Sequence, residues 1–486
     1  MARPTPSALR ARLPRFASLL ALAAAPLLFA CEGDSDSNVD DITDVKNSSV
    51  KNQSIGNCWV YASMGWAESL HLTQTAEELN LSESYVSYWH WYEQIAGGPN
   101  GKTQLAKLDK DQISTGGWFG LAAELMRRYG VMDEGAFIPE EGESARSSRQ
   151  SSALAAINTS LKSGALSDPA ARRDRKLVRA ELDRAWGLTP SVSTTLDQTF
   201  GADVSKTFMD SGNSPAADSG IRLASSIEVG KKISLSDAIG EPSSSYDFLK
   251  RKGKYAWNEV SFPKNTSSQR DYFRRMQQSM HAGMPVIMVW FVDFAAMDSQ
   301  NRFMAPPEKP GHQGGHMTVV EDYQASNVPG FGTLEAGTLV TDPKALDAAL
   351  ADEATIDFVR IKNSWGSSLA PPNASSDLRG YYDIYMPYFQ GPLTRCTESN
   401  GDACGIKASV TGLTSLVLPP DAFVTDAKAV EGACTDICVE GPARAPTCDE
   451  CTDLICSQDT WCCESGWDDA CVKEAVDICE LSCNSN

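Results

Sequence analysis

One cysteine of this sequence, Cys58, lies in a setting that could make its thiol a nucleophile. It begins an apolar, helix-compatible run, with Gln53 five residues upstream and Gly56 two residues upstream. The free N–H groups and positive dipole end at a helix amino terminus favour a thiolate and lower the pKa of a thiol. The Gln53 amide and the backbone N–H of Cys58 could then donate hydrogen bonds to an oxyanion. The simpler interpretation is a buried structural cysteine, and only other parts of the chain can decide against it.

A thiol nucleophile needs a base, and the base needs a group that orients its ring. Among the five histidines, His316 follows Gly314-Gly315 and opens a β-prone run, so it can reach into a cleft. His312, in the preceding loop, is the weaker candidate. Asn363 ends another β-prone run, and its side-chain oxygen could accept a hydrogen bond from the histidine. Trp365, two residues later, could support this pair by shielding that hydrogen bond from water.

The cysteines are distributed unevenly along the chain. Of the 14 cysteines, twelve lie from Cys396 onward, and the other two are Cys31 and Cys58. Twelve is an even number, which suits six disulfides in an oxidising compartment. No cysteine lies between Cys58 and Cys396, so Cys58 has no obvious pairing partner in its own domain. This favours a free, functional thiol.

The C-terminal segment from Cys434 to Cys483 holds ten cysteines in 50 residues. Its adjacent pair, Cys462 and Cys463, must bond to different partners, because neighbouring cysteines rarely satisfy disulfide geometry. Cys448 and Cys451 could alternatively bind zinc. We expect disulfides, since the segment has no histidine and more cysteines than one metal ion needs. No metal and no cofactor is expected.

The amino terminus is typical of an export signal. Four arginines precede an uncharged apolar stretch, Phe16 to Ala30, which is shorter than the roughly 20 residues of a membrane span. The stretch ends in Leu28-Phe-Ala-Cys31 and resembles the lipobox of bacterial lipoproteins, which implies cleavage before Cys31 and lipidation of its sulfur. An ordinary signal peptide with an incidental cysteine is the alternative. We therefore expect an exported lipoprotein, anchored through Cys31 to a membrane of the cell envelope, periplasmic or at the cell surface.

The composition allows a full-sized core and argues against nucleic acid as a partner. The chain has 486 residues, of which 42% are hydrophobic, and a formal net charge of -20 with a pI near 4.7. Phosphate binding needs a basic face, which such a balance does not favour.

The elements that must position the candidate residues change in type along the chain. The early patterns predict helices at 59–72, after an N-cap at Ser82, and at 119–129 with Gly130 as C-cap. A helical insertion with a loop-rich second half is expected at about 140–245. Later patterns predict a helix at 269–281 and β-prone runs at 284–292, 317–323, 338–341, 357–362 and 380–386. Helices first and strands later indicate an α+β protein in which the two are segregated.

Several motifs together resemble those of papain-like cysteine peptidases. Gln53, Cys58-Trp59, Gly116-Gly117, His316 and Asn363-Ser-Trp365-Gly366 occur in the order and rough spacing of that family. The similarity covers roughly residues 50–389. Three further stretches and the long insertion resemble the bleomycin hydrolase and aminopeptidase C branch; the stretches are Asn80 to Glu93, Gly116 to Val131 and Gly283 to Val286.

The resemblance implies a papain-like two-lobed α+β fold. Its helical left lobe would carry Cys58, its β-rich right lobe would carry His316 and Asn363, and the cleft would lie between them. Cys58 would be a thiolate paired with the His316 imidazolium and would form an acyl enzyme with a peptide or protein substrate. Gln53 and the Cys58 N–H would hold the oxyanion. Gly116 and Gly117 would line the substrate cleft, although a turn before a helix explains them equally simply.

The chain also departs from the family pattern. The spacing from Gln53 to Cys58 is one residue shorter than the usual six. An insertion follows Gly366 and remodels the expected rim of the cleft. The chain continues past Phe389, whereas the aminopeptidase branch blocks its cleft with its own C-terminus, so aminopeptidase specificity is not carried over. Endopeptidase or broad peptidase activity is at least as plausible, and the oligomeric state stays open.

These observations divide the chain into five expected parts. They are a signal peptide at 1–30, a lipidated cysteine and flexible linker at 31–49, a peptidase domain at 50–395, a connecting segment at 396–433 and a cysteine-rich module at 434–486. The function that we expect is peptide-bond hydrolysis through a Cys-His-Asn mechanism. A catalytically silent protein that uses the papain scaffold for binding or adhesion is the alternative. A transferase or isopeptidase with the same acyl-enzyme chemistry is a third possibility.

Overall fold

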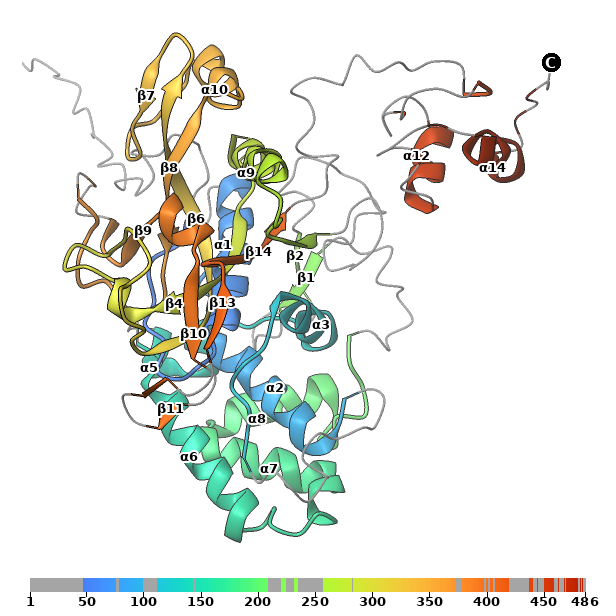
Figure 1. Ribbon diagram of the computed structural model, residues 1–486. Coiled ribbons are helices and arrows are strands. Elements are labelled where there is room, and N and C mark those ends of the chain that lie inside the picture. The colour runs from blue at the N-terminus through green and yellow to red at the C-terminus, as the bar shows by residue number, and fades with distance from the viewer. Residues whose placement is uncertain are drawn as a thin grey trace, which may run out of the picture. The chain divides into compact units, whose positions relative to one another are not determined.

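Figure 1 shows the computed structural model of the chain. It describes residues 47–75, 78–98, 112–142, 146–208, 220–223, 231–234, 257–281, 283–372, 374, 378–396, 399–400, 403–404, 407–418, 437–439, 444, 450–458, 462, 467, 469–479, 481 and 483. The predicted signal peptide, Cys31 and most of the linker lie outside these residues.

The first half of the described chain forms a helical lobe (Figure 1). Its elements are α1 (Cys58–Thr75), α2 (Glu83–Ala96), α3 (Phe119–Tyr129), α4 (Glu134–Phe137), α5 (Pro139–Gly142), α6 (Ser148–Ser163), η1 (Ala171–Arg173), α7 (Arg175–Trp186) and α8 (Pro190–Phe200). Capping residues close in sequence define the ends of several of these helices. The Ser82 hydroxyl accepts a hydrogen bond from the Tyr85 N–H at the start of α2. Gly130, with a φ of 70°, ends α3.

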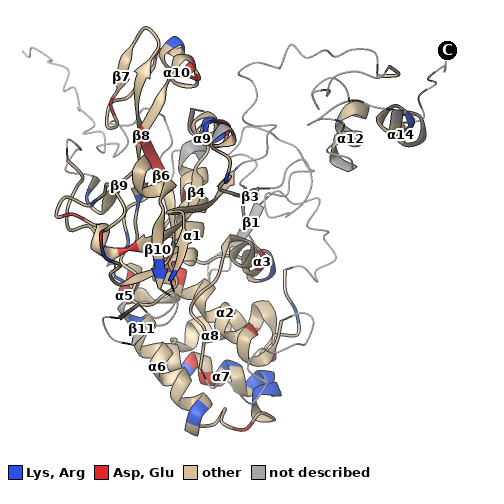
Figure 2. Ribbon diagram, in the orientation of Figure 1, with Lys and Arg blue, Asp and Glu red and all other residues tan. Residues whose placement is uncertain are grey.

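The segment 140–245, expected to be an insertion, contains helices α6 to α8 in its first half. Its second half contributes a short antiparallel hairpin of β1 (Gly220–Leu223) and β2 (Lys231–Ser234) within the described residues. Two arginines of α7 are paired with carboxylates: Arg179 contacts Asp183 and Asp197, and Arg184 contacts Glu181. Figure 2 shows these charges gathered around α7.

The second half of the chain forms an eight-stranded sheet in the order β3-β14-β4-β6-β8-β9-β5, with β7 paired to β6. All pairings except β5 with β9 are antiparallel. The strands are β3 (Asn258–Ser261), β4 (Val286–Asp293), β5 (Arg302–Phe303), β6 (Gln313–Val328), β7 (Gly332–Leu334), β8 (Thr355–Lys362), β9 (Tyr381–Tyr385) and β14 (Leu413–Leu418). The accompanying helices are α9 (Thr266–His281), η4 (Phe294–Ala296), α10 (Pro343–Ala349) and α11 (Met386–Gln390).

The sheet separates two hydrophobic cores. Alternate residues of β4 face opposite sides, so Ile287 joins the core around α1 while Met288 joins the core under α9. Both residues are at most 1% exposed, so both faces of β4 are buried and its sequence is a continuous apolar run. Helix α1 is buried on nearly all sides between the sheet and the other helices, so it has no polar face.

The sheet extends beyond residue 395, where we expected the peptidase domain to end. Strand β14 lies between β3 and β4 and hydrogen-bonds to both. It is preceded by a hairpin of β10 (Leu393–Cys396) and β13 (Lys407–Val410), and by the small pair β11 (Ser399–Asn400) and β12 (Ala403–Cys404). The expected strand at 338–341 is wrong, because these residues form a bend and a loop before α10.

The C-terminal module is small and cross-linked. Its described helices are α12 (Glu450–Gln458) and α14 (Asp469–Cys479). Among the cysteines that the structure describes, three disulfides join Cys438 to Cys483, Cys451 to Cys479 and Cys462 to Cys471. The disulfide prediction is therefore confirmed for Cys451, which had been considered as a zinc ligand.

The prediction of an α+β fold, with a helical lobe, a β-rich lobe and a disulfide-rich C-terminal module, is confirmed. Within the described part of the chain, no helix combines the length and the hydropathy that a membrane span requires.

Candidate active site

Cys58 is the first residue of α1, so its backbone N–H has no partner within the helix. It is half-buried, and it is the one free cysteine among the residues that the structure describes. The preceding residue, Asn57, is buried, and its backbone oxygen accepts from the Val60 N–H at the helix start. The Asn57 side chain donates to Ser87 and Gln150, each at 3.0 Å. These bonds hold the start of α1, and with it Cys58, against the rest of the helical lobe.

His316 and Asn363 meet inside the sheet lobe. The Nε2 atom of His316 lies 2.7 Å from Oδ1 of Asn363. The Ser364 N–H also donates to this Oδ1 at 2.7 Å, which identifies the atom as the amide oxygen. Because Oδ1 can only accept, Nε2 carries the proton and Nδ1 is the basic nitrogen of the neutral ring. The ring therefore has one oriented donor and one atom available as a base.

Two tryptophans enclose the His316 ring. Trp365 stacks on it at a centroid distance of 4.6 Å and an interplanar angle of 18°. Trp290 of β4 contacts it edge-on at 5.6 Å. His316 is 5% exposed and Asn363 is 3% exposed. The hydrogen bond between them is thus kept away from water, which strengthens it.

The Cys58 thiol lies against the strand that carries His316. Residues Met317 and Val319 of β6 belong to the same core as α1, and the Met317 N–H hydrogen-bonds to the thiol sulfur. Burial raises the pKa of the Cys58 thiol, and backbone N–H groups, including that of Met317, offset part of the rise. Burial lowers the pKa of His316 to about 4, although the hydrogen bond to Asn363 acts the other way. Both directions favour the neutral thiol and imidazole, so an ion pair between them would depend on their mutual attraction.

Gln53 is tied to the residue that follows Asn363. Its backbone N–H donates to the Ser364 oxygen at 2.8 Å, and its Oε1 accepts from the Ser364 hydroxyl. Its Nε2 donates to the Ile55 oxygen at 2.8 Å, which leaves the second N–H of the amide for another acceptor. The shortened spacing to Cys58 is thus accommodated by a turn within residues 53–57 that the amide itself braces.

Gly117 and Gly116 have different surroundings. A Cβ at Gly117 would lie 2.4 Å from the Trp59 indole, so only glycine fits there. The Trp59 Nε1 donates to the Thr115 oxygen at 2.8 Å, which fixes the indole against this turn. A Cβ at Gly116 would meet nothing within 4 Å. The neighbouring Trp118 is 51% exposed.

His312 does not share the position of His316. It is exposed and stacks on Phe294 at 6.0 Å, while Phe294 contacts Trp365. No group of three or more His, Cys, Asp or Glu side chains among the described residues is arranged to hold a metal ion.

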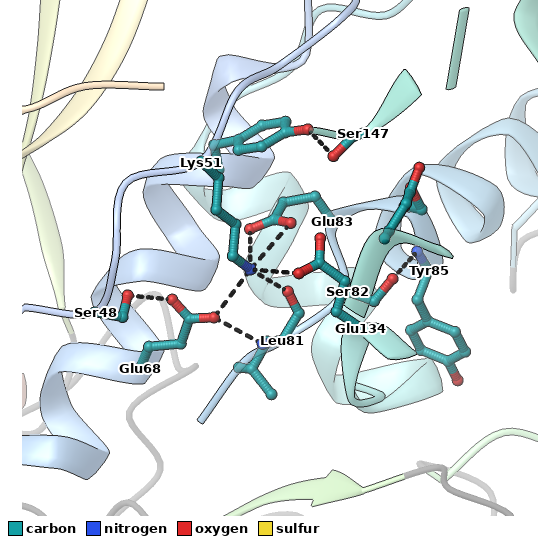
Figure 3. Close-up of polar contacts among 12 residues, drawn as sticks. Ser48, Lys51, Glu68, Leu81, Ser82, Glu83, Tyr85, Glu134 and Ser147 are labelled. Atoms are coloured by element: carbon teal, nitrogen blue, oxygen red, sulfur yellow. Dashed lines mark hydrogen bonds and ion pairs between the residues drawn. The ribbon is translucent and has the colours of Figure 1, made fainter. Parts of the chain in front are cut away.

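The structure also reveals a group of buried polar residues that the sequence did not single out. Lys51 Nζ donates to Glu83 at 3.0 Å, to Glu68 at 3.2 Å and to the Leu81 oxygen at 2.7 Å, as Figure 3 shows. It also lies 3.7 Å from Glu134. Burial alone would lower the pKa of Lys51, but the three carboxylates raise it. We define the buried clasp as Ser48, Lys51, Glu68, Glu83, Glu134 and Lys362.

A signal for the buried clasp was present in the sequence. Glu68 interrupts the apolar helix that follows Cys58, and Lys362 directly precedes Asn363 at the end of a β-prone run. A charged residue inside an apolar element has to find a partner when the element is buried. The partners themselves lie on other elements, and the sequence does not identify them.

Comparisons with known proteins concern separate parts of the chain. Residues 33–176 match a family model described as the Peptidase C1-like family, and residues 432–483 match one described as a domain of unknown function (DUF8252). No curated protein matches the chain.

Two solved structures resemble the chain weakly. PepW from Lactobacillus rhamnosis HN001 is 13% identical, with 80% of this chain and 84% of that chain covered and a TM-score of 0.37. Xylellain, a cysteine protease from Xylella fastidiosa, is 12% identical, with 78% and 85% covered and a TM-score of 0.30. The segment 33–176, which contains Gln53 and Cys58, is similar to the Peptidase C1-like family.

Proposed function

We propose that the chain is a cysteine peptidase in which Cys58, His316 and Asn363 hydrolyse peptide bonds. The observation that carries the proposal is the 2.7 Å hydrogen bond from His316 to Asn363, on the strand whose next residue contacts the Cys58 thiol. A histidine oriented through Nε2 presents Nδ1 as the base, as an activated thiol requires. The similarity of residues 33–176 to the Peptidase C1-like family supports the same assignment.

In the proposed reaction, His316 Nδ1 takes the proton of the Cys58 thiol as the sulfur attacks the carbonyl carbon of a peptide bond. The tetrahedral oxyanion accepts hydrogen bonds from the Cys58 N–H at the start of α1 and from the free N–H of the Gln53 amide. The imidazolium then protonates the leaving amine, the C–N bond breaks and a thioester remains. His316 next removes a proton from water, which attacks the thioester carbonyl; the carboxylate product leaves and the thiol is restored.

Asn363 holds the His316 imidazole through a hydrogen bond, and Trp365 holds it by stacking on the ring. Because the site is enclosed, the hydrogen bond between His316 and Asn363 is stronger than it would be in water. Gly116 is exposed and no atom lies within 4 Å of the position of a Cβ there, which leaves room for the backbone of a peptide, while Gly117 packs closely against Trp59. We propose the stretch of Gly116 and Gly117 as part of the substrate site.

We further propose that the enzyme is exported and lipid-anchored through Cys31. The basic start, the apolar stretch of residues 16–30 and the Leu28-Phe-Ala-Cys31 motif support this location. An oxidising compartment also fits the three disulfides of the C-terminal module.

The test is hydrolysis of a mixed peptide library by the purified chain in the presence of a thiol. We expect an epoxide inhibitor of thiol peptidases to block hydrolysis and to modify Cys58, as peptide mass spectrometry would detect. Cys58→Ala and His316→Ala should each lower kcat/KM by roughly 10³-fold or more. His312→Ala is the matched control, because this exposed histidine lies outside the pair and should leave kcat/KM within a few-fold of the native value. Activity retained by Cys58→Ala would refute the proposal.

A further inference from the structure

The buried clasp joins the segments that carry the proposed catalytic groups. Lys362 directly precedes Asn363, Lys51 lies two residues before Gln53, and Glu68 belongs to α1, which begins with Cys58. Figure 3 shows the side chains of Ser48, Lys51, Glu68 and Glu83 pointing toward one another. One polar group therefore contacts all three segments.

Ser48 is the link between the two lobes in this group. Lys362 Nζ donates to the Ser48 hydroxyl at 2.6 Å, and that hydroxyl donates to Glu68 Oε2 at 2.5 Å. A single oxygen thus connects the end of β8 with α1. The Lys362 side chain reaches α1 at Gly65, where a Cβ would lie 3.5 Å from Nζ. All the residues of this link are less than 10% exposed.

The Asn363 side chain has little else to hold it. Its Oδ1 accepts from His316 and from the Ser364 N–H, but its Nδ2 is buried and has no hydrogen-bond partner among the described residues. A cavity of about 20 Å³ adjoins it, lined in part by Lys51, Glu68, Lys362 and Asn363. The placement of Asn363 therefore depends on its backbone neighbours. Ser364 is held by Gln53 on one side, and Lys362 is held by Ser48 on the other.

We propose that Ser48 and Lys362 are positioning residues of the active site. Their hydrogen bond holds the backbone before Asn363 and, through Asn363, sets the His316 ring against the Cys58 thiol. The inference rests on the proposed function for the roles of His316 and Cys58. Misplacing a catalytic group by about 1 Å can lower a rate by about 10²-fold, so the loss of this link should be visible in activity.

The main test uses Ser48→Ala, which removes the bridging oxygen, and Lys362→Met, which removes the ammonium group. Both should lower kcat about ten-fold or more with KM within two-fold of the native value. Both should also slow alkylation of Cys58 by iodoacetamide at pH 6 about ten-fold, measured on the Cys58 peptide by mass spectrometry. Ser48→Thr keeps the hydroxyl and should restore both rates to within about three-fold.

Arg128→Met is the matched control. It breaks a buried ion pair with Glu93 within the helical lobe, in which the Arg128 Nε and Glu93 Oε1 atoms lie 2.7 Å apart and neither residue belongs to the clasp. It should lower Tm without changing kcat or the alkylation rate more than two-fold. Native kcat and alkylation in Ser48→Ala would overturn the inference, and so would an equal loss of kcat in Arg128→Met, because the effect would then be one of stability alone.

The alkylation assay separates this inference from the proposed function. If the native chain cleaves no peptide but Cys58 alkylation at pH 6 still depends on Ser48, the positioning role stands and peptide hydrolysis is wrong. If the native chain cleaves peptides and Ser48→Ala does so equally well, the proposed function stands and the positioning role is wrong.

Discussion

The body of the chain, residues 47–418, and the C-terminal module, residues 437–483, are stabilised by different interactions. The body buries two large hydrophobic cores on either side of its sheet. Among its described residues, the module has a small hydrophobic core of Ile455, Cys462, Trp467, Cys471 and Ala475, and three disulfides join described cysteines. A small segment cannot bury enough apolar area to offset its loss of conformational entropy, so covalent links take over that role.

The difference also explains where a reactive thiol can exist. The two cores of the body contain no disulfide among the described residues, although Cys396 at the end of β10 is disulfide-bonded. A domain that folds by apolar burial can keep Cys58 free. In the module, by contrast, its described cysteines are used for structure.

The largest expected effect is that of complete disulfide reduction, which should affect the module and the body differently. With dithiothreitol, we expect the module to unfold while the cores of the body stay folded, because only the module depends on disulfides. Hydrogen–deuterium exchange followed by mass spectrometry would report both regions in one sample. Loss of protection in α1 or β6 on reduction would contradict the division of roles.

Removing the disulfides one at a time should show how much each of them stabilises the module. The loops they close span 45, 28 and 9 residues for Cys438–Cys483, Cys451–Cys479 and Cys462–Cys471. Chain entropy then predicts losses in the free energy of unfolding of the module of about 4, about 3.6 and about 2.6 kcal/mol for the paired Cys→Ala variants in that order. Urea unfolding followed through Trp467 fluorescence, against the other tryptophans as background, would measure them. A different order would mean that native contacts outweigh loop length.

A smaller effect should appear in the pH dependence of the body. Burial raises the pKa of Glu141 to about 7, and it lowers the pKa of His90 and His281 to about 4, like that of His316. Between about pH 4.5 and 7 the folded body holds the Glu141 carboxyl proton, which the unfolded chain has released. This carboxyl therefore makes the folded body less stable as pH rises. As pH falls from about 6.5 to 4, the unfolded chain gains histidine protons that the folded body lacks. The three histidines therefore make the folded body less stable as pH falls.

The three histidines outweigh the single carboxyl below about pH 6.5, and above it the two contributions are small and of opposite sign. We therefore expect the unfolding free energy of the body to rise from about pH 4.5 to about pH 6.5, as chemical denaturation at a series of pH values would measure. Glu141→Gln, which removes the opposing carboxyl, should make that rise steeper. An unfolding free energy that falls between about pH 4.5 and 6.5 would argue that other groups dominate.

Local signals account for what the sequence predicted well. Ser82 caps α2, Gly130 ends α3 and the apolar run after Cys58 is α1, because each depends on residues within a few positions. The order of Cys58, His316 and Asn363 along the chain was also visible, and the structure brings His316 and Asn363 into contact.

Long-range partners explain what the sequence did not reveal. The place of β14 between β3 and β4 is decided by pairing across more than 120 residues. The β-prone run at 338–341 finds no partner strand and stays a loop. Lys51 contacts carboxylates on three other elements, and no spacing along the chain predicts which ones.

Strand β14 is the last strand of the sheet in chain order, and this position affects how the protein folds. Strands β3 and β4 are not hydrogen-bonded to each other, and only β14 joins them. The end of the sheet that contains β3 therefore stays incomplete until β14 has paired, and pairings of such long sequence separation form slowly. A chain that stopped at residue 395 would leave the edge of β4 unpaired, and an open apolar edge invites aggregation. Completion of the sheet is thus a late step in folding, and it depends on a strand that lies outside the segment from Gln53 to Gly366, which holds the proposed catalytic residues.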